Sequence, residues 1–408
     1  MKFDFDNIVI RKGTDSVKWN GDVIASICSN RKADAFWVAD MDFKTEPHIK
    51  KTAEKEAALG VFGYPLEDPV TSIFSSWTEK RHDWKIDESQ SVFVNGLLHG
   101  VALAIDLFTN KGDGILVPSP TYKPFREICQ DNDRIMLDVP LKKNGDGTFS
   151  LDKDSFRSAL DEAAAVLFCS PHNPSGLVFD KEDLLFVLDE AKKRNKLVIS
   201  DEIHADLTHP GKTHIPMGKA NEEIGADTIT FMAPSKTFNL AGEHAGFAVF
   251  SSKERFEIFQ RKQRALRVTT PGYTIKQLMS AAYNDGYEYN KELCSYLEGT
   301  VEEMKAYLAK DCPSLKLANA EASFVTFLDC SEVYEKIEKK VLSDPERYAL
   351  SPGGGVLSTF FGVEAGVCMN DGTWFGSAYK EYVRINYGTS RAFTLDALRR
   401  IADAVKAL

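Results

Sequence analysis

The sequence has few cysteines, and none of them lie close together. Its seven cysteines are scattered along 408 residues without a Cys-x-x-Cys pair, at Cys28, Cys129, Cys169, Cys294, Cys312, Cys330 and Cys368. An odd number of widely spaced thiols does not fit a disulfide framework, and without closely spaced pairs a structural zinc site is not expected either. We therefore expect neither disulfides nor a bound metal.

Long apolar runs and an excess of basic charge are also missing. No apolar run approaches the roughly 18 residues that a membrane-spanning helix needs, and residues 1–6 lack the apolar core of a signal peptide. The formal net charge of −10 argues against nucleic acid as the main partner, because phosphate backbones select basic surfaces. These absences predict a cytoplasmic protein that binds a small molecule and has no membrane or nucleic-acid partner.

What the sequence does contain, between about residues 115 and 250, is an alternation of short apolar runs and amphipathic segments. Lys181–Arg194, for example, has the apolar spacing of a helix and lies between two runs typical of buried strands. Strands that alternate with helices predict a parallel sheet wrapped by helices, and hence the α/β class. The predicted strands are Ser91–Val94, Gly114–Val117, Ala165–Phe168, Lys196–Ser200 and Asp227–Met232.

The pattern changes after about residue 285. Apolar residues then recur every three or four positions from Leu293 to Leu308, which predicts a long helix, and strand-like runs follow at Ser323–Leu328 and Tyr382–Asn386. A chain of 408 residues is about the right length for two domains. We predict an N-terminal segment over residues 1–45 that packs with a small domain, a large cofactor-binding domain over 46–285 and a small C-terminal domain over 286–408.

Polar residues follow the predicted strands at the positions where open α/β sheets bind ligands, beyond the carboxyl ends of the strands. Asn173, Asp201 and Lys236 each follow one of these strands. Taken singly, each has an ordinary explanation: a turn residue before proline, a helix cap and a surface charge. Together they supply an amide, an acid and an imine-forming amine, the set that a pyridoxal cofactor needs from its protein.

Three motifs, Asn173–Gly176, Ser200–His204 and Ser235–Gly242, carry a resemblance to a known family. In order and spacing they resemble those of fold-type I pyridoxal-phosphate enzymes, the aspartate aminotransferase family. The resemblance covers essentially the whole chain. It implies a large domain with a mostly parallel seven-stranded sheet flanked by helices, a smaller α/β domain, and pyridoxal 5′-phosphate as the cofactor.

Further stretches resemble the branch of cystathionine β-lyases and cysteine-S-conjugate β-lyases: Arg11–Trp19, Trp37–Phe43, Phe62–Tyr64, Pro171–Pro174 and Asp201–His204. This branch implies cleavage of cystathionine or a related S-substituted cysteine to a thiol, pyruvate and ammonia. Transamination of an amino acid is the alternative, because it needs the same residues. A second alternative is a regulatory protein that binds pyridoxal phosphate and has little turnover.

By the resemblance, three residues are catalytic. Lys236 holds the cofactor as an imine and, once substrate has displaced it, removes the Cα proton. Asp201 pairs with the pyridinium nitrogen and keeps it protonated. Tyr122 stacks on the pyridine ring, although a tyrosine in a proline-rich loop is otherwise usually a packing residue.

The resemblance also implies contacts to the cofactor oxygen and to the substrate. Asn173 and His204 are expected at the phenolate oxygen, with His204 standing where many relatives have tyrosine. Arg384 is expected to grip the substrate α-carboxylate, which a guanidinium fork matches in shape; its ordinary explanation is an edge-strand arginine that faces water. Asp40 and Met41 are predicted to bind substrate as well.

The cofactor phosphate is expected at the start of a helix. Backbone N–H groups of Gly96, Leu97 and Leu98 should hold it, with help from the Ser235 hydroxyl. His244 stands where many transaminases have an arginine. A histidine can supply a hydrogen bond there but no permanent bidentate charge.

Tyr64 is expected to reach the phosphate of a second subunit, as the equivalent tyrosine does in relatives. The resemblance therefore implies a homodimer with shared active sites and a small amino acid as substrate.

Overall fold

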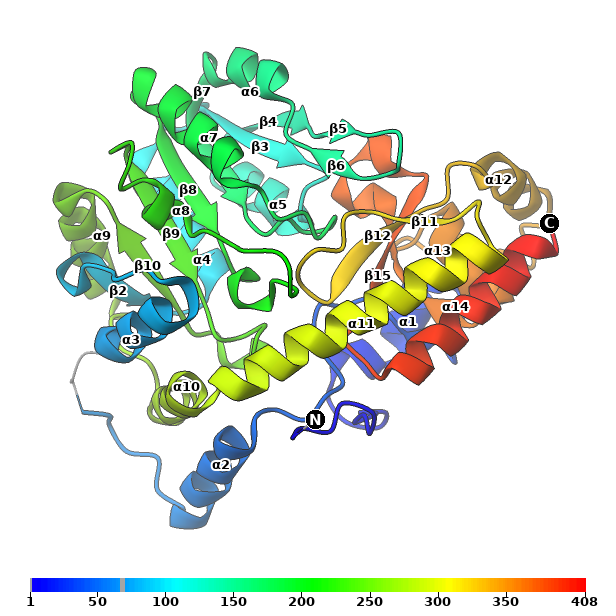
Figure 1. Cartoon of the computed structure of the whole chain (residues 1–408), viewed down its shortest axis with the longest axis horizontal. Coiled ribbons are helices and arrows are strands. Elements are labelled where there is room, and N and C mark those ends of the chain that lie inside the picture. Colours follow the sequence, from blue (N-terminus) through cyan, green and yellow to red (C-terminus); the bar gives the residue numbers. More distant parts are fainter. Residues whose placement is uncertain (1, 67–69) are drawn as a thin grey trace.

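The computed structural model describes residues 2–66 and 70–408, and a seven-stranded sheet lies at the centre of its larger half (Figure 1). The strand order is β2-β10-β9-β8-β7-β3-β4. Strand β10 is antiparallel to both of its neighbours, and the other neighbouring pairs are parallel. The strands are β2 (Ser91–Val94), β3 (Gly114–Ser119), β4 (Ile135–Pro140), β7 (Ala163–Cys169), β8 (Leu197–Asp201), β9 (Thr228–Met232) and β10 (Gly246–Phe250).

Helices cover both faces of this sheet. Successive residues of a strand point to opposite faces, and in β7 the side chains of Ala165 and Leu167 pack in one apolar cluster while those of Val166 and Phe168 pack in another. Burial on both faces explains why these strands are near-continuous apolar runs in the sequence. One cluster includes α4 (Leu97–Phe108), α5 (Lys123–Asp131) and α9 (Lys253–Leu266); the other includes α6 (Lys153–Leu160), α7 (Lys181–Lys193) and α8 (Met217–Ala220).

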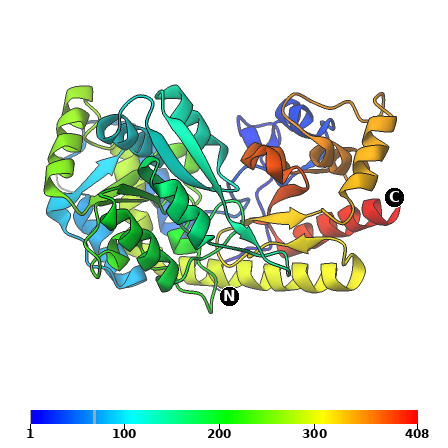
Figure 2. The same ribbon diagram turned by 90° about the horizontal axis from the view of Figure 1, so that it is seen from above.

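A smaller antiparallel sheet, in the order β11-β12-β15-β14, forms the second half of the molecule. The 25-residue helix α11 (Tyr287–Asp311) contains the predicted apolar repeat and extends beneath both halves in Figure 2. The other elements of this half are β11 (Lys316–Leu317), β12 (Val325–Asp329), α12 (Tyr334–Ser343), α13 (Val356–Glu364), β14 (Asn370–Asp371), β15 (Tyr382–Asn386) and α14 (Arg391–Lys406).

The N-terminal segment lies against the smaller half. Strand β1 (Asp34–Ala35) pairs in parallel with β13 (Val367–Cys368), and α1 (Gly21–Cys28) contacts α13. The division into domains at residues 45 and 285 stays a prediction. The remaining elements are α2 (Pro47–Leu59), α3 (Thr71–His82), β5 (Lys142–Lys143), β6 (Phe149–Ser150) and α10 (Tyr273–Asp285).

The predicted α/β fold with a mostly parallel seven-stranded sheet is confirmed. The sequence placed Asp201 just beyond its strand, whereas the structure makes it the last residue of β8. Lys236 lies four positions beyond the end of β9. Within the ranges that the structure describes, no helix has the length and apolar character required to cross a membrane.

Candidate active site

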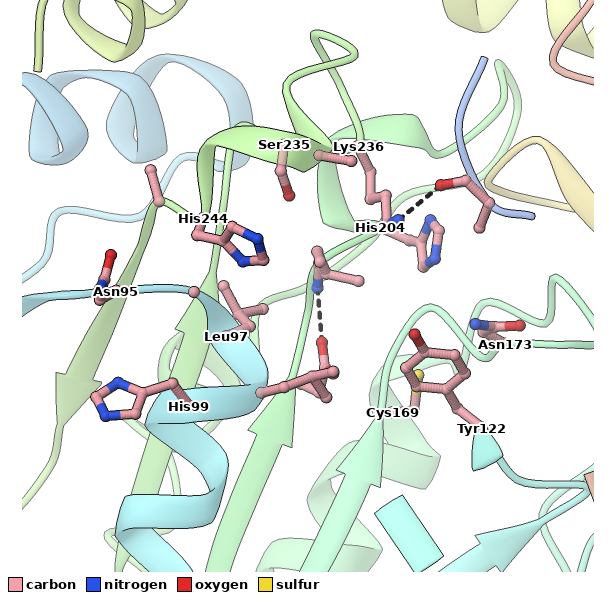
Figure 3. A pocket seen from close by; sticks show the side chains of 17 residues that line it. Asn95, Leu97, His99, Tyr122, Cys169, Asn173, His204, Ser235, Lys236 and His244 are labelled. Carbon is pink, nitrogen blue, oxygen red and sulfur yellow. Dashed lines mark hydrogen bonds between the residues drawn. The ribbon is translucent and has the colours of Figure 1, made fainter. Parts of the chain in front are cut away.

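The carboxyl ends of the parallel strands border a cavity of about 290 Å³. Figure 3 shows Tyr122, Asn173 and His204 on one side of this cavity, and Leu97 and His244, at the start of α4 and after β9, on the other. The sheet therefore brings together residues that lie far apart in the sequence. Those predicted for the site that line the cavity are Gly96, Leu97, Leu98, Tyr122, Asn173, Asp201, His204, Ser235, Lys236 and His244.

The Lys236 side chain enters this cavity with its amine held by one backbone carbonyl. Its Nζ donates a hydrogen bond to Ala39 O at 2.6 Å. Burial lowers the pKa of Lys236 to about 8, because a desolvated ammonium is less stable than a neutral amine, and the charge of Arg384 acts in the same direction. The neutral amine of Lys236 is thus more populated near neutral pH than that of an ordinary lysine, as a nucleophile and base requires.

Asp201 is a buried carboxylic acid whose charge has few partners. It is 3% exposed, and the backbone N–H of Ile203 donates to its Oδ1 at 3.0 Å. Burial raises the pKa of Asp201 to about 6. A cationic group in the cavity would stabilise the ionised form, which is the role of a pyridinium partner.

His204 and Asn173 place two further polar groups at the cavity wall. His204 Nδ1 lies 2.9 Å from Ser323 Oγ, and the ring is only 2% exposed. Burial lowers the pKa of His204 to about 3, with the charges of Lys236 and Arg384 adding to the effect. His204 is therefore a neutral imidazole, and its tautomer decides whether Nε2 donates or accepts a hydrogen bond in the cavity.

Arg384, on β15, is a buried guanidinium whose hydrogen-bond partners are neutral. Nη1 donates to Asn173 Oδ1 at 3.1 Å, and Nη2 donates to Trp37 O at 2.9 Å and to Asn370 Oδ1 at 2.7 Å. Nε is buried without a hydrogen-bond partner. Burial lowers the pKa of Arg384 to about 10. In the described part of the chain no carboxylate pairs with this cation, so a carboxylate of the substrate can do so.

A second cavity, of about 200 Å³, continues from the first and is lined by Arg384. Tyr122 and Lys236 line both cavities, so the amine and the guanidinium face a shared space. Burial raises the pKa of Tyr122, which keeps its hydroxyl protonated. The arrangement places an amine, an aromatic ring and a buried guanidinium around two adjoining cavities.

The start of α4 has backbone N–H groups that could hold an anion. Gly96 is its N-cap, and a glycine has no side chain to satisfy the first backbone N–H groups of the helix. Gly96 has a φ of +92°, which glycine adopts without strain, and a Cβ there would lie 3.4 Å from His244 Nδ1. The buried Ser235 also lines this part of the cavity.

These observations fit pyridoxal 5′-phosphate. The uncapped helix start matches its phosphate, the partly unsatisfied acid Asp201 matches its ring nitrogen, and the neutral amine of Lys236 matches its aldehyde. Asn173, His204 and Tyr122 line the space between them. The individual contacts stay predictions.

Two of the predicted substrate-binding residues lie elsewhere. Met41 is fully buried in the apolar core, and its backbone N–H and carbonyl are hydrogen-bonded to Asn239. Asp40 forms a two-pronged ion pair with Arg11, at 2.8 and 3.0 Å. Neither residue lines the two cavities. The segment contacts the site through its backbone, since the carbonyls of Trp37 and Ala39 accept hydrogen bonds from Arg384 and Lys236, and a substrate-binding role for Asp40 and Met41 stays a prediction.

Tyr64 is likewise absent from the cavity of its own chain. It is fully exposed, on a stretch in which Leu59, Val61, Phe62 and Leu66 are also 60% exposed or more. A role for Tyr64 in this site would therefore have to be played in a second subunit, as predicted.

Sequence reasoning missed several lining residues, among them Asn95, His99, Cys169 and Ile203. Asn95 and Cys169 lie at strand ends, where the rule that found Asp201 could have found them. Ala39 lies within the Trp37–Phe43 motif, but its contact could not be predicted, because it is made by a backbone carbonyl, which every residue has.

Comparisons with known proteins agree with this geometry. The model of the family described as aminotransferase class I and II matches residues 47–401. The cystathionine β-lyase PatB of Bacillus subtilis (strain 168) is 31% identical over 405 residues, which cover 98% of this chain and 100% of that protein.

Two solved structures have the same fold. Cystalysin from Treponema denticola, which contains a pyridoxal 5′-phosphate cofactor, has a TM-score of 0.88 at 25% identity, and the match covers 100% of both chains. A pyridoxal-phosphate-bound structure from Clostridium difficile 630, described as an aminotransferase, has a TM-score of 0.90 at 27% identity, covering 99% of this chain and 100% of that one. With the matched model spanning most of the sequence, this chain belongs to the aminotransferase class I and II family, as its motifs predicted.

Proposed function

We propose that this protein is a carbon–sulfur lyase with pyridoxal 5′-phosphate as its cofactor. It takes an S-substituted cysteine, such as cystathionine, and one water molecule, and it releases a thiol, pyruvate and ammonium. The observation that carries the proposal is the convergence of Lys236, Asp201 and Arg384 on adjoining cavities. The likeness to PatB over nearly the whole chain supports a lyase rather than a transaminase.

Residues at the strand ends would hold the cofactor. The start of α4, with Ser235, receives its phosphate, Asp201 pairs with its ring nitrogen, and Lys236 binds its aldehyde. When bound, the cofactor supplies an electron sink for the electron pair left when Cα loses its proton. Asp201 sustains that sink because its carboxylate keeps the ring nitrogen protonated.

Lys236 acts as the base at Cα. A neutral amine has two N–H donors and one lone pair, and donation of one N–H to Ala39 O leaves the lone pair free to take a proton. The pKa of about 8 lies near physiological pH, where a general base is most effective. For the thiolate to leave as the proton is removed, the substrate would have to be held with its C–S bond in one fixed orientation.

Arg384 fixes that orientation through the substrate α-carboxylate. Its guanidinium is held by Asn173, Trp37 and Asn370, so it does not have to be ordered when substrate binds. An ion pair formed away from bulk water is also stronger than one on the surface.

Coupled assays of the purified holoenzyme test the reaction. With cystathionine, cystine or S-methylcysteine, pyruvate and ammonium should appear in equal amounts, together with a thiol or, from cystine, cysteine persulfide. Fast conversion of alanine or aspartate to keto acids, with S-substituted cysteines unreacted, would establish the aminotransferase instead. A change in cofactor absorbance on substrate binding without any product would indicate the regulatory protein.

A homodimer with shared sites is the second part of the proposal. The exposed apolar stretch that includes Phe62 and Tyr64 supports it, because a large exposed apolar patch marks an interaction surface. Subunit mixing tests the shared site: a Lys236→Ala protein and a Tyr64→Ala protein, each nearly inactive, should regain part of the activity when mixed. If hybrids form, as mass spectrometry of tagged subunits would show, but stay inactive, Tyr64 does not act in the partner's site.

A further inference from the structure

Residues 37–42, here called the strap, contact the active-site side chains Lys236 and Arg384 through their backbone and carry two carboxylates, Asp40 and Asp42, that pair with Arg11 and Lys18. Two strap carbonyls face the active site. Trp37 O accepts a hydrogen bond from Arg384 Nη2 at 2.9 Å, and Ala39 O accepts one from Lys236 Nζ at 2.6 Å. The backbone of the strap thus contacts both the base and the carboxylate-binding cation.

The intervening carbonyls of the strap are anchored on the other side. The side-chain amide of Asn386 donates to Val38 O at 2.5 Å and to Asp40 O at 2.7 Å. Lys18 Nζ donates to Asp40 O as well, at 3.0 Å. The carbonyls of Trp37 and Ala39 therefore contact Arg384 and Lys236, and the alternating carbonyls of Val38 and Asp40 anchor the strap.

Buried charges complete this anchor. Lys18 Nζ lies 3.0 Å from Asp42 Oδ2, and both residues are 1% exposed. Trp19 Nε1 donates to Asp42 Oδ1 at 3.0 Å, and Arg11 pairs with both Asp40 and Asp42. The group has two cations and two anions, so its formal charge is balanced.

Stability alone is a weak reason for such a group. Removing two charges from water costs about as much as their attraction returns, and a well-packed apolar pair of similar volume is often at least as stable. A buried ion pair does fix the positions of its two residues, because each charge has its hydrogen-bonding partners in only one arrangement of the chain. Here the restricted geometry is that of the strap carbonyls.

We propose that Lys18 and Asp42 are positioning residues for the lyase reaction: they set the strap so that the Ala39 carbonyl orients the Lys236 amine and the Trp37 carbonyl orients Arg384. The proposal rests on the proposed function, which makes Lys236 the base at Cα. Ala39 O occupies one N–H of the amine and leaves its lone pair for the substrate proton. A displaced strap would leave the amine free to rotate.

The decisive variant is the charge-balanced double substitution Lys18→Met with Asp42→Asn in the full-length holoenzyme. It removes one cation and one anion, so the net charge near Lys236 stays the same and a change in Lys236 reflects its position. We expect kcat to fall by about tenfold to a hundredfold, the range that small misplacements of catalytic groups produce. KM should rise because Arg384 loses its backbone partner.

A second readout does not depend on turnover. After removal of the cofactor, the rate at which added pyridoxal phosphate attaches to Lys236 is measured against pH, because only the neutral amine attacks. Loss of the Ala39 acceptor removes a hydrogen bond that favours the ammonium, so the midpoint of this profile should move to lower pH in the double variant. The single variant Lys18→Met leaves an excess of negative charge, which stabilises the Lys236 ammonium. If the charges act only through their electric field, this variant should therefore move the midpoint of the attachment profile to higher pH.

Two further variants complete the design. Asn386→Leu removes the amide anchor without changing any charge, and it should reproduce both effects even if the double variant fails to fold. Lys143→Met with Asp329→Asn is the charge-balanced control: Lys143, 42% exposed, pairs at 2.9 Å with Asp329, whose side chain is 6% exposed, and neither residue lines the two cavities. This control should change the stability of the protein but neither kcat nor the pH profile of cofactor attachment.

The outcomes separate the two proposals. If the double variant and Asn386→Leu both keep kcat and the attachment profile within about twofold of wild type, the strap is structural only and the inference is wrong. If wild type does not cleave S-substituted cysteines but the attachment profiles shift as described, the proposed function fails and the positioning role stands.

Discussion

Asp201 and Asp206 are two equally buried carboxylates, five positions apart, that have opposite electrostatic environments. Each is 3% exposed. Asp201 accepts the Ile203 N–H at the edge of a cavity, and burial raises its pKa to about 6. Asp206 accepts hydrogen bonds from Trp77 and Thr237 and contacts His82 Nε2 at 2.8 Å.

The pKa of Asp206 is lowered as a result. Desolvation alone would raise it, but the contact with His82 and the positive field of Arg81 outweigh burial. A buried carboxylate whose oxygens are all hydrogen-bonded to the protein stabilises the fold, whereas a buried carboxylate at a cavity with few protein partners can bind a ligand. Lys236 and Arg384 resemble Asp201 in this respect. Burial lowers the pKa of both bases, as it raises the pKa of the acid, because in each case the charged form is poorly stabilised by the protein.

The largest expected effect comes from Lys236→Ala. Loss of the group proposed to bind the cofactor and to remove the Cα proton should reduce kcat by about 10⁴-fold or more. Borohydride reduction of the wild-type holoenzyme followed by peptide mapping checks the assignment, because the label should lie on Lys236. Lys219→Ala, at a half-buried lysine paired with Asp83, is the control and should retain activity. A label on a different lysine would contradict the assignment.

Asp201→Asn and Asp206→Asn test the comparison itself. Asp201 has a folded pKa of about 6, above its usual 3.8, so its contribution to stability is fully present below about pH 4 and is lost as pH rises through 6. The cofactor-free Asp201→Asn variant should therefore be more stable than wild type at pH 7, by about 3 kcal/mol, with no difference near pH 4. Its kcat should fall by about a hundredfold or more.

The Asp206→Asn variant should behave in the opposite way. The folded pKa of Asp206 is lowered, so its contribution is present above the unfolded pKa and is lost as pH falls. The variant should be destabilised by about 2 kcal/mol at pH 7 and less at acid pH, with a small effect on kcat. Urea unfolding of both cofactor-free variants between pH 4 and 8 measures the two slopes. If the stability change relative to wild type had the same pH dependence in both variants, Asp201 and Asp206 would not differ in electrostatic environment.

Arg384 and Arg134 extend the comparison to cations. Both are buried, but the guanidinium of Arg134 donates to Thr109 Oγ1 and to backbone carbonyls at the end of α4, whereas Arg384 has an unpartnered Nε at a cavity. Arg384→Ala should raise KM for S-substituted cysteines by about 10- to 100-fold, the value of one charged contact. Arg134→Ala should lower the melting temperature and leave KM unchanged. Equal KM values for Arg384→Ala and wild type would refute the carboxylate role.

His204→Phe should have the smallest effect, about fivefold to tenfold on cofactor affinity, since one neutral hydrogen bond contributes about 1 kcal/mol. With a pKa of about 3, His204 does not ionise in the working range, so the limbs of the kcat–pH profile between pH 5 and 9 should stay in place. Fluorescence titration of the cofactor and a pH series check both statements. A limb that disappears in the variant would show that His204 titrates in catalysis.

Much of the fold could be predicted from local pattern. The apolar run at Gly114–Val117 forms the first four residues of β3, Ala165–Phe168 is the centre of β7, and Lys181–Arg194 differs from α7 by one residue. The antiparallel direction of β10 was not predictable, because a strand buried on both faces has the same apolar pattern in either direction.

The sequence by itself determined which residues stand at the ends of the strands. Asn173, Asp201 and Lys236 follow apolar runs, and parallel strands present their carboxyl ends at one edge, so their convergence follows from order along the chain. Only the tertiary structure decided what each charge faces. Asp206 meets His82 from a distant helix, while Asp201 meets a cavity. Ala39, 197 positions from Lys236, reaches the amine because backbone carbonyls make contacts that no side-chain pattern records.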